Sequence, residues 1–457
     1  MDYTVKDLEM WNDRIEEVVK RVNLDYYPQE FEIIGYKEMI GYEAYVGMPS
    51  RYPHWSFGKA YEKNRTLYRY NLTGLPYEMV INSNPCLAYL MRENTLLLQI
   101  LTMAHVYGHN DFFKNNRLFK EGTDANRTIE MFKVHADTIR SYINDPSIGY
   151  ENVERVLDAA HSLKMQTSRA VGEKRIDEEE IKKRMMDSYL EQTGSYSILD
   201  GYKEVPAPDI SKVPLSPEDD LLYFIIKHGN LAEWEKNILS IVRDETLYFI
   251  PQIETKIMNE GWASYWHYTI LNELELPTGL HLEFIKRHND VIAPIIGGLN
   301  PYFLGFKIFE YLDKTYGREK IFEVRECDRD ASFLRRYLTE DLCTEFNLFE
   351  YVRKSGDIYV KEVADESGWK EIRNSLAADC GMGSVPYIRV YDMNLKDKTL
   401  TLEHVYDGRE LQLSYTEGTL KYIQELWGYK VRMKTVIDGK ELYIVCDENK
   451  KLMVAEI

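Results

Sequence analysis

The sequence lacks any uninterrupted run of about 18 apolar residues, the length that a helix needs to cross a bilayer, so no membrane insertion is expected. Its first residues, MDYTVKDLEMWNDRIEEVV, do not combine a basic segment with a following apolar core, and no signal peptide is predicted. Cysteine is scarce, and the five cysteines form no Cys-x-x-Cys pair, which argues against a disulfide framework and a thiolate zinc site. These absences predict a cytoplasmic protein.

An excess of basic residues is also missing, because 57 Lys and Arg stand against 75 Asp and Glu, and the formal net charge is -18. This balance argues against a nucleic-acid partner and against adhesion to anionic membranes. The chain contains no G-x-x-x-x-G-K-[ST] phosphate loop, no Rossmann glycine fingerprint and no G-x-S-x-G elbow. Nucleotide-dependent chemistry and serine hydrolysis therefore have no support in the sequence.

Residues 1–350 are predicted to form a mostly helical body, because apolar residues recur there at intervals of three and four. Three segments stand apart from this pattern: an aromatic, irregular region of loops and short strands, a charged connector or solvated helix, and a Pro-rich linker (residues 50–80, 172–192 and 193–217). A helix start is predicted at Ser216, with Pro217 in the first helical position and two acids in the first turn.

Residues 351–457 are predicted to form a small α+β domain, since the apolar period changes to that of strands. Strands are expected in five segments (DIYVKEV, PYIRVYDMNL, TLTLEHVY, YKVRMKTVI and ELYIVCD). One helix is expected over about residues 415–427, and Asp438-Gly439 predicts a hairpin between the last two strands. The predicted fold class is a mainly α large domain with a small α+β C-terminal domain.

Two histidines stand four residues apart in the segment ILTMAHVYGHNDFFKNN. On a helix, His105 and His109 fall on one stripe with Leu98, Leu101 and Phe112. Both imidazoles are therefore expected to point into the interior, where the leucines point.

A carboxylate and a further imidazole are likewise expected to point into the interior in the segment QIETKIMNEGWASYWHY. On one continuous helix, Glu260 and His267 share a stripe with Ile253 and Ile257. Burying one unpaired carboxylate costs several kcal/mol or shifts its pKa until the group is neutral. A shared cation would relieve that cost for the carboxylate and the imidazoles together.

His105, His109 and Glu260 are accordingly predicted to bind one divalent ion. A His-x-x-x-His pair with a later helical Glu is the ligand set of zincin metallopeptidases, in which water takes the fourth position on zinc. Zinc is the expected metal in such a zincin-like helical site, although the residues leave another divalent metal open. Two alternatives exist: histidines hydrogen-bonded within the core remain open, while a di-iron bundle would need Glu-x-x-His motifs that the sequence lacks.

The predicted site departs from the zincins at the general base. Those enzymes carry a glutamate directly after the first histidine, and Val106 stands at that position here. Glu254 and His267, expected on the same helix as Glu260, are the candidates for moving protons at a bound water. His267 would donate a proton to a leaving group or stabilise an oxyanion.

Several long segments resemble the stage V sporulation protein R family: NPCLAYLMRENTLLLQILTMAHVYGHNDFFKNN, KIMNEGWASYWHY, GGLNPYFLGFKIF, LEHVYDGREL and ELWGY. The resemblance extends over nearly the whole chain. It implies a cytoplasmic protein needed for the spore cortex, a modified peptidoglycan, and it implies no particular reaction.

Together these observations predict a zinc-dependent, hydrolase-like protein of cortex formation that acts on an amide of a peptide or peptidoglycan-related substrate. The alternative is a regulatory or scaffolding protein of cortex assembly. In that case the buried histidines are structural, and the C-terminal domain binds a protein partner.

Overall fold

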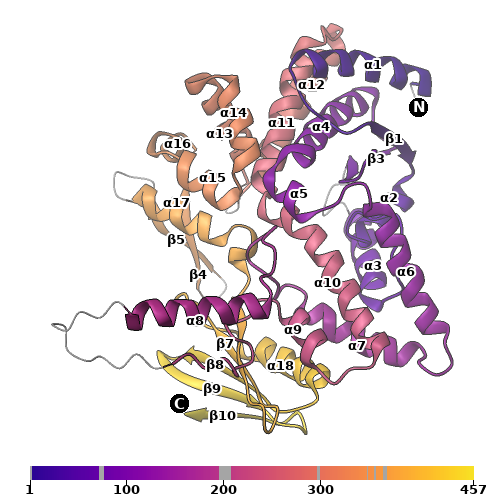
Figure 1. Cartoon of the computed structure of the whole chain (residues 1–457). Helices are drawn as coiled ribbons and strands as arrows, with labels where there is room; N and C mark the ends of the chain where they lie inside the picture. Colours follow the sequence, from indigo (N-terminus) through magenta and orange to yellow (C-terminus); the bar gives the residue numbers. More distant parts are fainter. Residues whose placement is uncertain are drawn as a thin grey trace. The chain divides into compact units, whose positions relative to one another are not determined.

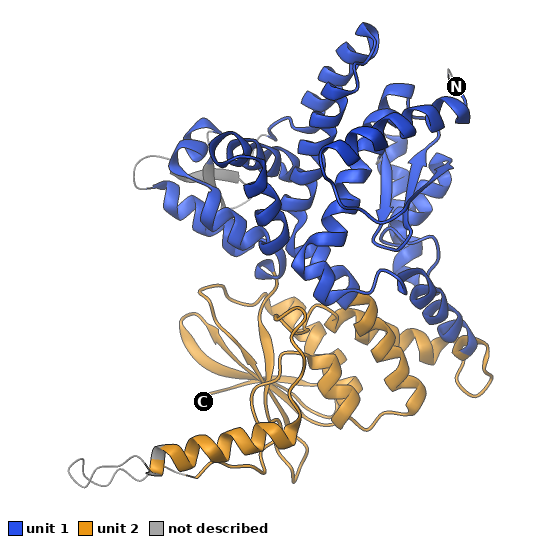
Figure 2. Cartoon of the chain, turned by 45° about the horizontal axis from the view of Figure 1, so that its top comes forward, with its two compact units in different colours: residues 1–141, 247–384 blue, residues 142–246, 385–457 orange. Residues whose placement is uncertain are grey.

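The computed structural model (Figure 1) describes seven segments of the chain: residues 3–70, 77–194, 207–295, 299–346, 348–354, 357–363 and 368–456. The chain divides into two compact units, and each unit is built from two separate stretches of sequence (Figure 2). Unit 1 comprises residues 1–141 and 247–384, and unit 2 comprises residues 142–246 and 385–457. The predicted boundary at residue 350 remains a prediction.

Unit 1 is mainly helical. Its helices are α1 (Val5–Arg21), α2 (Tyr36–Ala44), α3 (Trp55–Arg69), α4 (Leu96–Asn115), α5 (Arg117–Gly122), α11 (Lys256–Glu273), α12 (Thr278–Val291), α13 (Pro301–Tyr316), α14 (Arg318–Cys327), α15 (Asp330–Tyr337), α16 (Glu340–Glu345) and α17 (Gly368–Asp379). Two long helices, α6 (Thr128–Asn144) and α10 (Glu233–Glu254), belong partly to unit 1 and partly to unit 2.

A three-stranded sheet of order β1-β3-β2 accompanies these helices. It consists of β1 (Gln29–Ile34), β2 (Glu78–Ile81) and β3 (Cys86–Met91). The central strand β3 is almost entirely buried, pairs in parallel with β1 and pairs antiparallel with β2. A second, antiparallel pair is formed by β4 (Phe349–Lys354) and β5 (Asp357–Val363).

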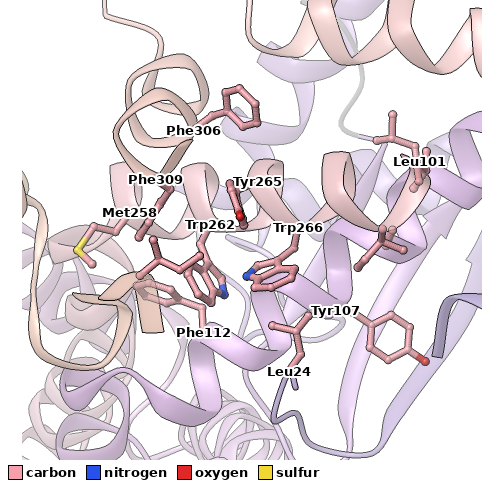
Figure 3. Close-up of a cluster of buried hydrophobic side chains, with 14 of the residues drawn as sticks. Leu24, Leu101, Tyr107, Phe112, Met258, Trp262, Tyr265, Trp266, Phe306 and Phe309 are labelled. Atoms are coloured by element: carbon pink, nitrogen blue, oxygen red, sulfur yellow. The ribbon is translucent and has the colours of Figure 1, made fainter. Parts of the chain in front are cut away.

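The core of unit 1 centres on α11, which packs against both α4 and α13. Trp262 and Trp266 are fully buried on α11, and Figure 3 shows their indoles pointing from that helix toward Phe112 of α4. The ring of Trp262 meets that of Phe309 on α13 edge-on, with centroids 5.1 Å apart. Large aromatic side chains of this kind supply much of the apolar area that a core buries.

Unit 2 combines a five-stranded sheet with helices. The strands are β6 (Ile388–Met393), β7 (Leu400–His404), β8 (Val431–Ile437), β9 (Lys440–Cys446) and β10 (Leu452–Glu456), in the order β10-β9-β8-β7-β6. The helices that lie wholly in this unit are α7 (Tyr150–Leu163), α8 (Glu178–Gly194), α9 (Leu221–His228) and α18 (Leu413–Trp427). Helix α18 connects β7 to β8, which run parallel, and packs on β8 and β9.

The predicted fold class is confirmed: the chain is mainly helical, with a small sheet and one helix at its C-terminal end. Strands β5 to β8 lie in the first four predicted segments, β9 begins one residue before the fifth, and α18 covers the predicted helix. The predicted hairpin joins β8 to β9 through Asp438 and Gly439, whose φ angles of 50° and 72° suit a tight turn between antiparallel strands.

Two local predictions are wrong. Within residues 50–80, predicted to form loops and short strands, β2 begins at Glu78, but Trp55–Arg69 form helix α3, which has no buried residue and therefore shows no apolar stripe. Residues 71–76 of this region lie outside the described residues. The helix predicted to start at Ser216 begins instead at Leu221, because the side chain of Asp220 accepts a hydrogen bond from the backbone N–H of Tyr223 and caps it. Residues 195–206 of the predicted linker lie outside the described residues.

Candidate metal site

Helix α4 carries the two predicted histidine ligands and is buried on nearly every side. Thr95 caps its start by accepting a hydrogen bond from the N–H of Leu98 at 3.3 Å. At its far end, Asn116 terminates α4, and its side chain accepts from the N–H of Leu118 to begin α5. A helix without an exposed face must satisfy its polar side chains inside the protein.

Helix α11 carries Glu260 and His267, and it begins at a buried carboxylate. The two oxygens of Asp330 accept hydrogen bonds from the N–H groups of Ile257 and Met258, at 2.8 and 2.9 Å. The first N–H groups of a helix have no partner within it and need acceptors from elsewhere. Asp330 therefore fixes where α11 begins.

Helices α4 and α11 approach each other closely because small residues stand where they cross. A methyl group on Gly108 would lie 2.7 Å from the Cα of Ala263, a separation that real Cβ contacts do not show. Gly108 immediately precedes His109, and Ala263 lies three residues after Glu260. The close crossing thus brings the histidine face of α4 next to the glutamate of α11.

The three predicted ligands meet at one point. The Oε2 atom of Glu260 lies 3.6 Å from the Nε2 atom of His109 and 3.9 Å from the Nε2 atom of His105. These separations exceed the usual 2.7–3.2 Å of an N–H···O hydrogen bond. Two ligands on one tetrahedral zinc with bonds of about 2.1 Å lie about 3.4 Å apart. The spacing is therefore closer to that of metal ligands than to that of a hydrogen-bonded cluster.

A second carboxylate, which the sequence did not reveal, joins the same cluster. Glu78 is the first residue of β2, and its Oε1 atom lies 3.9 Å from the Nε2 atom of His105. One ligand atom each from Glu78, His105 and His109 fit within 4.8 Å of one another, a grouping suited to a metal ion. The side chains of Glu78 and Glu260 each retain 19% of their accessible surface, so both carboxylates remain reachable from the cavity.

The outer nitrogens of both histidines are occupied by hydrogen bonds. Nδ1 of His109 lies 2.9 Å from Oδ1 of Asn259, and Nδ1 of His105 lies 2.9 Å from Nδ1 of His267. An amide oxygen accepts only, so the Nδ1–H of His109 donates to it, and the lone pair of Nε2 is left to face the cluster. Metal-bound histidines are usually oriented in this way by a partner at the other nitrogen.

His267 continues the chain of imidazoles. Its Nε2 lies 2.8 Å from Nδ1 of His288, and both rings are buried. If Nδ1–H of His105 donates to His267, then Nε2–H of His267 donates to His288, and every bond in the chain has one donor and one acceptor. Both ring nitrogens of His267 are hydrogen-bonded to histidines, so its ring is fixed. His267 in turn holds the ring of His105 in place.

Burial favours the neutral form of three imidazoles here, those of His109, His267 and His288. It lowers the pKa of His109 and of His288 to about 4, and it lowers the pKa of His267 well below its ordinary value, with neighbouring histidines and Lys307 adding to the effect. A histidine must be neutral to bind a metal through a ring nitrogen. His109, the predicted ligand among these three, is therefore neutral near pH 7, as metal binding through a ring nitrogen requires.

The two carboxylates respond differently to the same burial. Burial would raise the pKa of Glu260, but the two imidazoles and the neighbouring Tyr302 hydroxyl outweigh it and lower that pKa. Burial dominates at Glu78 and raises its pKa, and the charge of Glu260 adds to the rise, although His105 opposes it. Two carboxyl groups with pKa values pushed apart are suited to different roles in one site.

The cluster lines a cavity of about 550 Å³ in unit 1. Its described lining includes three carboxylates, Glu43, Glu78 and Glu260, and no Lys or Arg. Glu43 accepts a hydrogen bond from the hydroxyl of Tyr68, and Tyr302 stands beside Glu260. The cavity can accommodate a small peptide-like group beside the histidine and glutamate side chains.

The structure does not bring Glu254 to this cavity. The prediction of one continuous helix is wrong, because Thr255, with φ -130° and ψ 21°, separates α10 from α11. The carboxylate of Glu254 accepts hydrogen bonds from the N–H of Met382 at 2.9 Å and from Arg329 at 3.1 Å. These hydrogen bonds give Glu254 a structural role.

Comparison with known proteins agrees with the resemblance seen in the sequence. A family described as SpoVR like protein matches residues 2–385, and one described as SpoVR-like C-terminal domain matches residues 386–438. The Uncharacterized protein YcgB of Escherichia coli (strain K12) is 34% identical over 476 residues, which cover 95% of this chain and 92% of that protein. No solved structure matches the chain.

The fold and the site define a mainly helical protein with a buried His–His–Glu cluster that faces a cavity. The chain belongs to the SpoVR-like family and is a sporulation-related protein. In the part of the chain that the structure describes, every helix is too short or too polar to cross a membrane.

Proposed function

We propose that this protein is a cytoplasmic, zinc-dependent amide hydrolase that acts on a peptide or peptidoglycan-related substrate during spore cortex formation. One observation carries the proposal. The Nε2 atoms of His105 and His109 converge on an oxygen of Glu260 at 3.6–3.9 Å, while hydrogen bonds occupy both Nδ1 atoms.

The donor set favours zinc and hydrolysis. Two imidazoles and one carboxylate with an open fourth position are typical of catalytic zinc, whereas structural zinc sites are closed by four protein ligands. When bound at such a site, zinc polarises a carbonyl and lowers the pKa of a coordinated water. His267 and Asn259 would hold the ligand rings in position, and Tyr302 would hold Glu260.

The charge of the cavity favours an amide over a phosphate ester. A divalent ion would not fully compensate the three carboxylates of the described lining, and neither Lys nor Arg adds positive charge there. Enzymes that bind phosphoryl groups usually place Arg or Lys beside them. A neutral peptide bond needs no such compensation.

The cellular setting is supported by the family and by the cysteines. Membership of the SpoVR-like family connects the chain to sporulation, and cortex formation is the process in which an amide hydrolase would find peptidoglycan-related substrates. All five cysteines are free thiols, as is usual in a reducing compartment.

Complementation tests the proposal against the scaffolding alternative. Glu260→Gln keeps the size of the side chain but removes its charge, so the protein should accumulate normally and fail to restore sporulation to a null strain. Glu32→Gln, an exposed residue on β1, is the matched control and should restore it. Full sporulation with a folded Glu260→Gln protein would favour the scaffolding role.

A further inference from the structure

Amide hydrolysis at this cluster needs a group that accepts a proton from water, and neither position predicted from the helices supplies one. Val106, which replaces the glutamate expected after the first histidine, is fully buried in the core. Glu254 is held by Arg329 and Met382 away from the cavity. The acceptor must therefore come from another element that reaches the cavity.

The carboxylates of the described cavity lining differ in their surroundings. Glu260 approaches the Nε2 atoms of both ligand histidines within ion-pair distance, and Glu43 is engaged with Tyr68. Glu78 comes within that distance of His105 alone, and no hydrogen bond joins its carboxylate to another described residue. Of the three, Glu78 is the one whose oxygens are free to take a proton.

Glu78 comes from strand β2, whereas the predicted ligands come from helices α4 and α11. The backbone of Glu78 pairs with that of Leu90 in the buried central strand β3, so its position is fixed from the sheet rather than from the ligand helices. A carboxylate supplied by a rigid strand beside the ligand nitrogens can contact a water bound at the open position.

We propose that Glu78 is the catalytic base of the hydrolase, a role that rests on the proposed function. Glu78 takes one proton from the attacking water, and the water oxygen forms a bond to the carbonyl carbon of the amide. The C–N bond then breaks as Glu78 passes that proton to the nitrogen, which leaves as the amine. The products are a carboxylic acid and an amine, and no oxidant or reductant is needed.

The competing role for Glu78 is that of a fourth metal ligand, and binding measurements separate the two. Zinc affinity can be measured by competition with a chelator on the full chain, and acetohydroxamic acid serves as a probe of the open position. A hydroxamic acid gives up a proton when it binds zinc, and a neighbouring carboxylate can accept that proton whereas a glutamine cannot. The proteins compared are wild type, Glu78→Gln, Glu260→Gln and the control Glu32→Gln.

The base role predicts a specific pattern. Glu78→Gln should bind zinc within about fivefold of wild type, since only a nearby charge is lost, and should bind acetohydroxamic acid about tenfold or more weakly. Glu260→Gln should lose about a hundredfold in zinc affinity, because a ligand is removed. Glu32→Gln should match wild type in both measurements. Glu78→Asp, which retracts the carboxylate, should behave like Glu78→Gln and replaces it if that variant does not fold.

Three results would overturn the inference, and they differ from one another. If Glu78→Gln loses as much zinc affinity as Glu260→Gln, Glu78 is a metal ligand. If Glu78→Gln binds both zinc and acetohydroxamic acid as tightly as wild type does, Glu78 has no role at the open position. Absence of zinc binding in the wild-type protein refutes the proposed function itself, and the base role with it.

Discussion

Gly261 and Gly305 face each other where helices α11 and α13 cross, with no room for a side chain between them. A methyl group on Gly305 would lie 2.1 Å from the carbonyl oxygen of Ile257 and 2.7 Å from the Cα of Gly261. Glu260 is the neighbour of one glycine, and Tyr302 lies one turn before the other. The direct backbone contact therefore helps to set the distance between the Glu260 carboxylate and the Tyr302 hydroxyl beside it.

Gly305→Ala should destabilise the protein, because neither helix can move away without disturbing the core. Overpacking of this kind typically costs about 1–3 kcal/mol in the free energy of unfolding, which a denaturant titration measures. Gly58→Ala is the matched control, because Gly58 lies on α3, which has no buried residue, and nothing lies within 4 Å of the added methyl group. The stability of the Gly58→Ala protein should be unchanged or slightly higher. Equal stability of the two variants would contradict the packing described for α11 and α13.

Asp111 should be indispensable to the core. Its carboxylate is fully buried, accepts hydrogen bonds from the indole N–H of Trp262 and the backbone N–H of Asp25, and lies 3.5 Å from the guanidinium of Arg325. Asp111→Ala leaves a buried cation without its counter-charge and should cost about 3–5 kcal/mol in the free energy of unfolding. A loss below about 1 kcal/mol would show that water or another group compensates Arg325.

The stability of the protein should also carry a pH dependence that originates at Asp330. Burial raises the pKa of Asp330 to about 7, although the N–H groups of Ile257 and Met258 oppose the rise. The folded state then holds this proton more tightly than the unfolded state, whose aspartates titrate near 3.9. The contribution of Asp330 is therefore largest at acid pH and is lost as the pH rises through about 7.

The wild-type protein and Asp330→Asn should be compared by denaturant titration between about pH 5 and pH 8. The stability of the wild type relative to Asp330→Asn should fall with rising pH, by at most about 1.4 kcal/mol per pH unit. A difference that stays constant or grows with pH would show that Asp330 is not protonated in the fold near neutrality.

Asn259 should matter for metal binding and little for folding. Its side-chain oxygen fixes the ring of His109, and loss of such a partner typically lowers metal affinity by about 10–100-fold. Asn259→Ala should therefore bind zinc more weakly, as measured by chelator competition. Asn272→Ala on the same helix is the control, since Asn272 is exposed and bonds only to its own helix at Tyr268. Similar affinities for the two variants would argue against a metal on His109.

Much of this arrangement could be predicted from helical periodicity. His105, His109 and Glu260 stand on apolar stripes, and the structure places their side chains together in the interior. The strands of the C-terminal region likewise follow from their β-branched and aromatic residues, and the hairpin follows from Asp438 and Gly439. In each case the decisive signal lies within one element.

What could not be predicted depends on contacts between distant elements. Glu78 reaches the cluster because β2 pairs with β3, and a single glutamate at the start of a strand carries no periodic signal. The break at Thr255 leaves no signal in the sequence, because the stripe of apolar residues continues across it. The carboxylate of Asp330, at which the next helix starts, comes from far along the chain. Asn259 and His288 are visible only through the hydrogen bonds they make.

The central claim is that His105, His109 and Glu260 share a metal ion, and the zinc content of the purified protein tests it most directly. Protein prepared without a histidine tag and dialysed against metal-free buffer should retain about one zinc per chain by mass spectrometry. His105→Ala should lose that zinc, whereas His281→Ala, a partly exposed histidine of α12, should keep it. Less than about half an equivalent in the wild type, or an unchanged content in His105→Ala, would contradict the account.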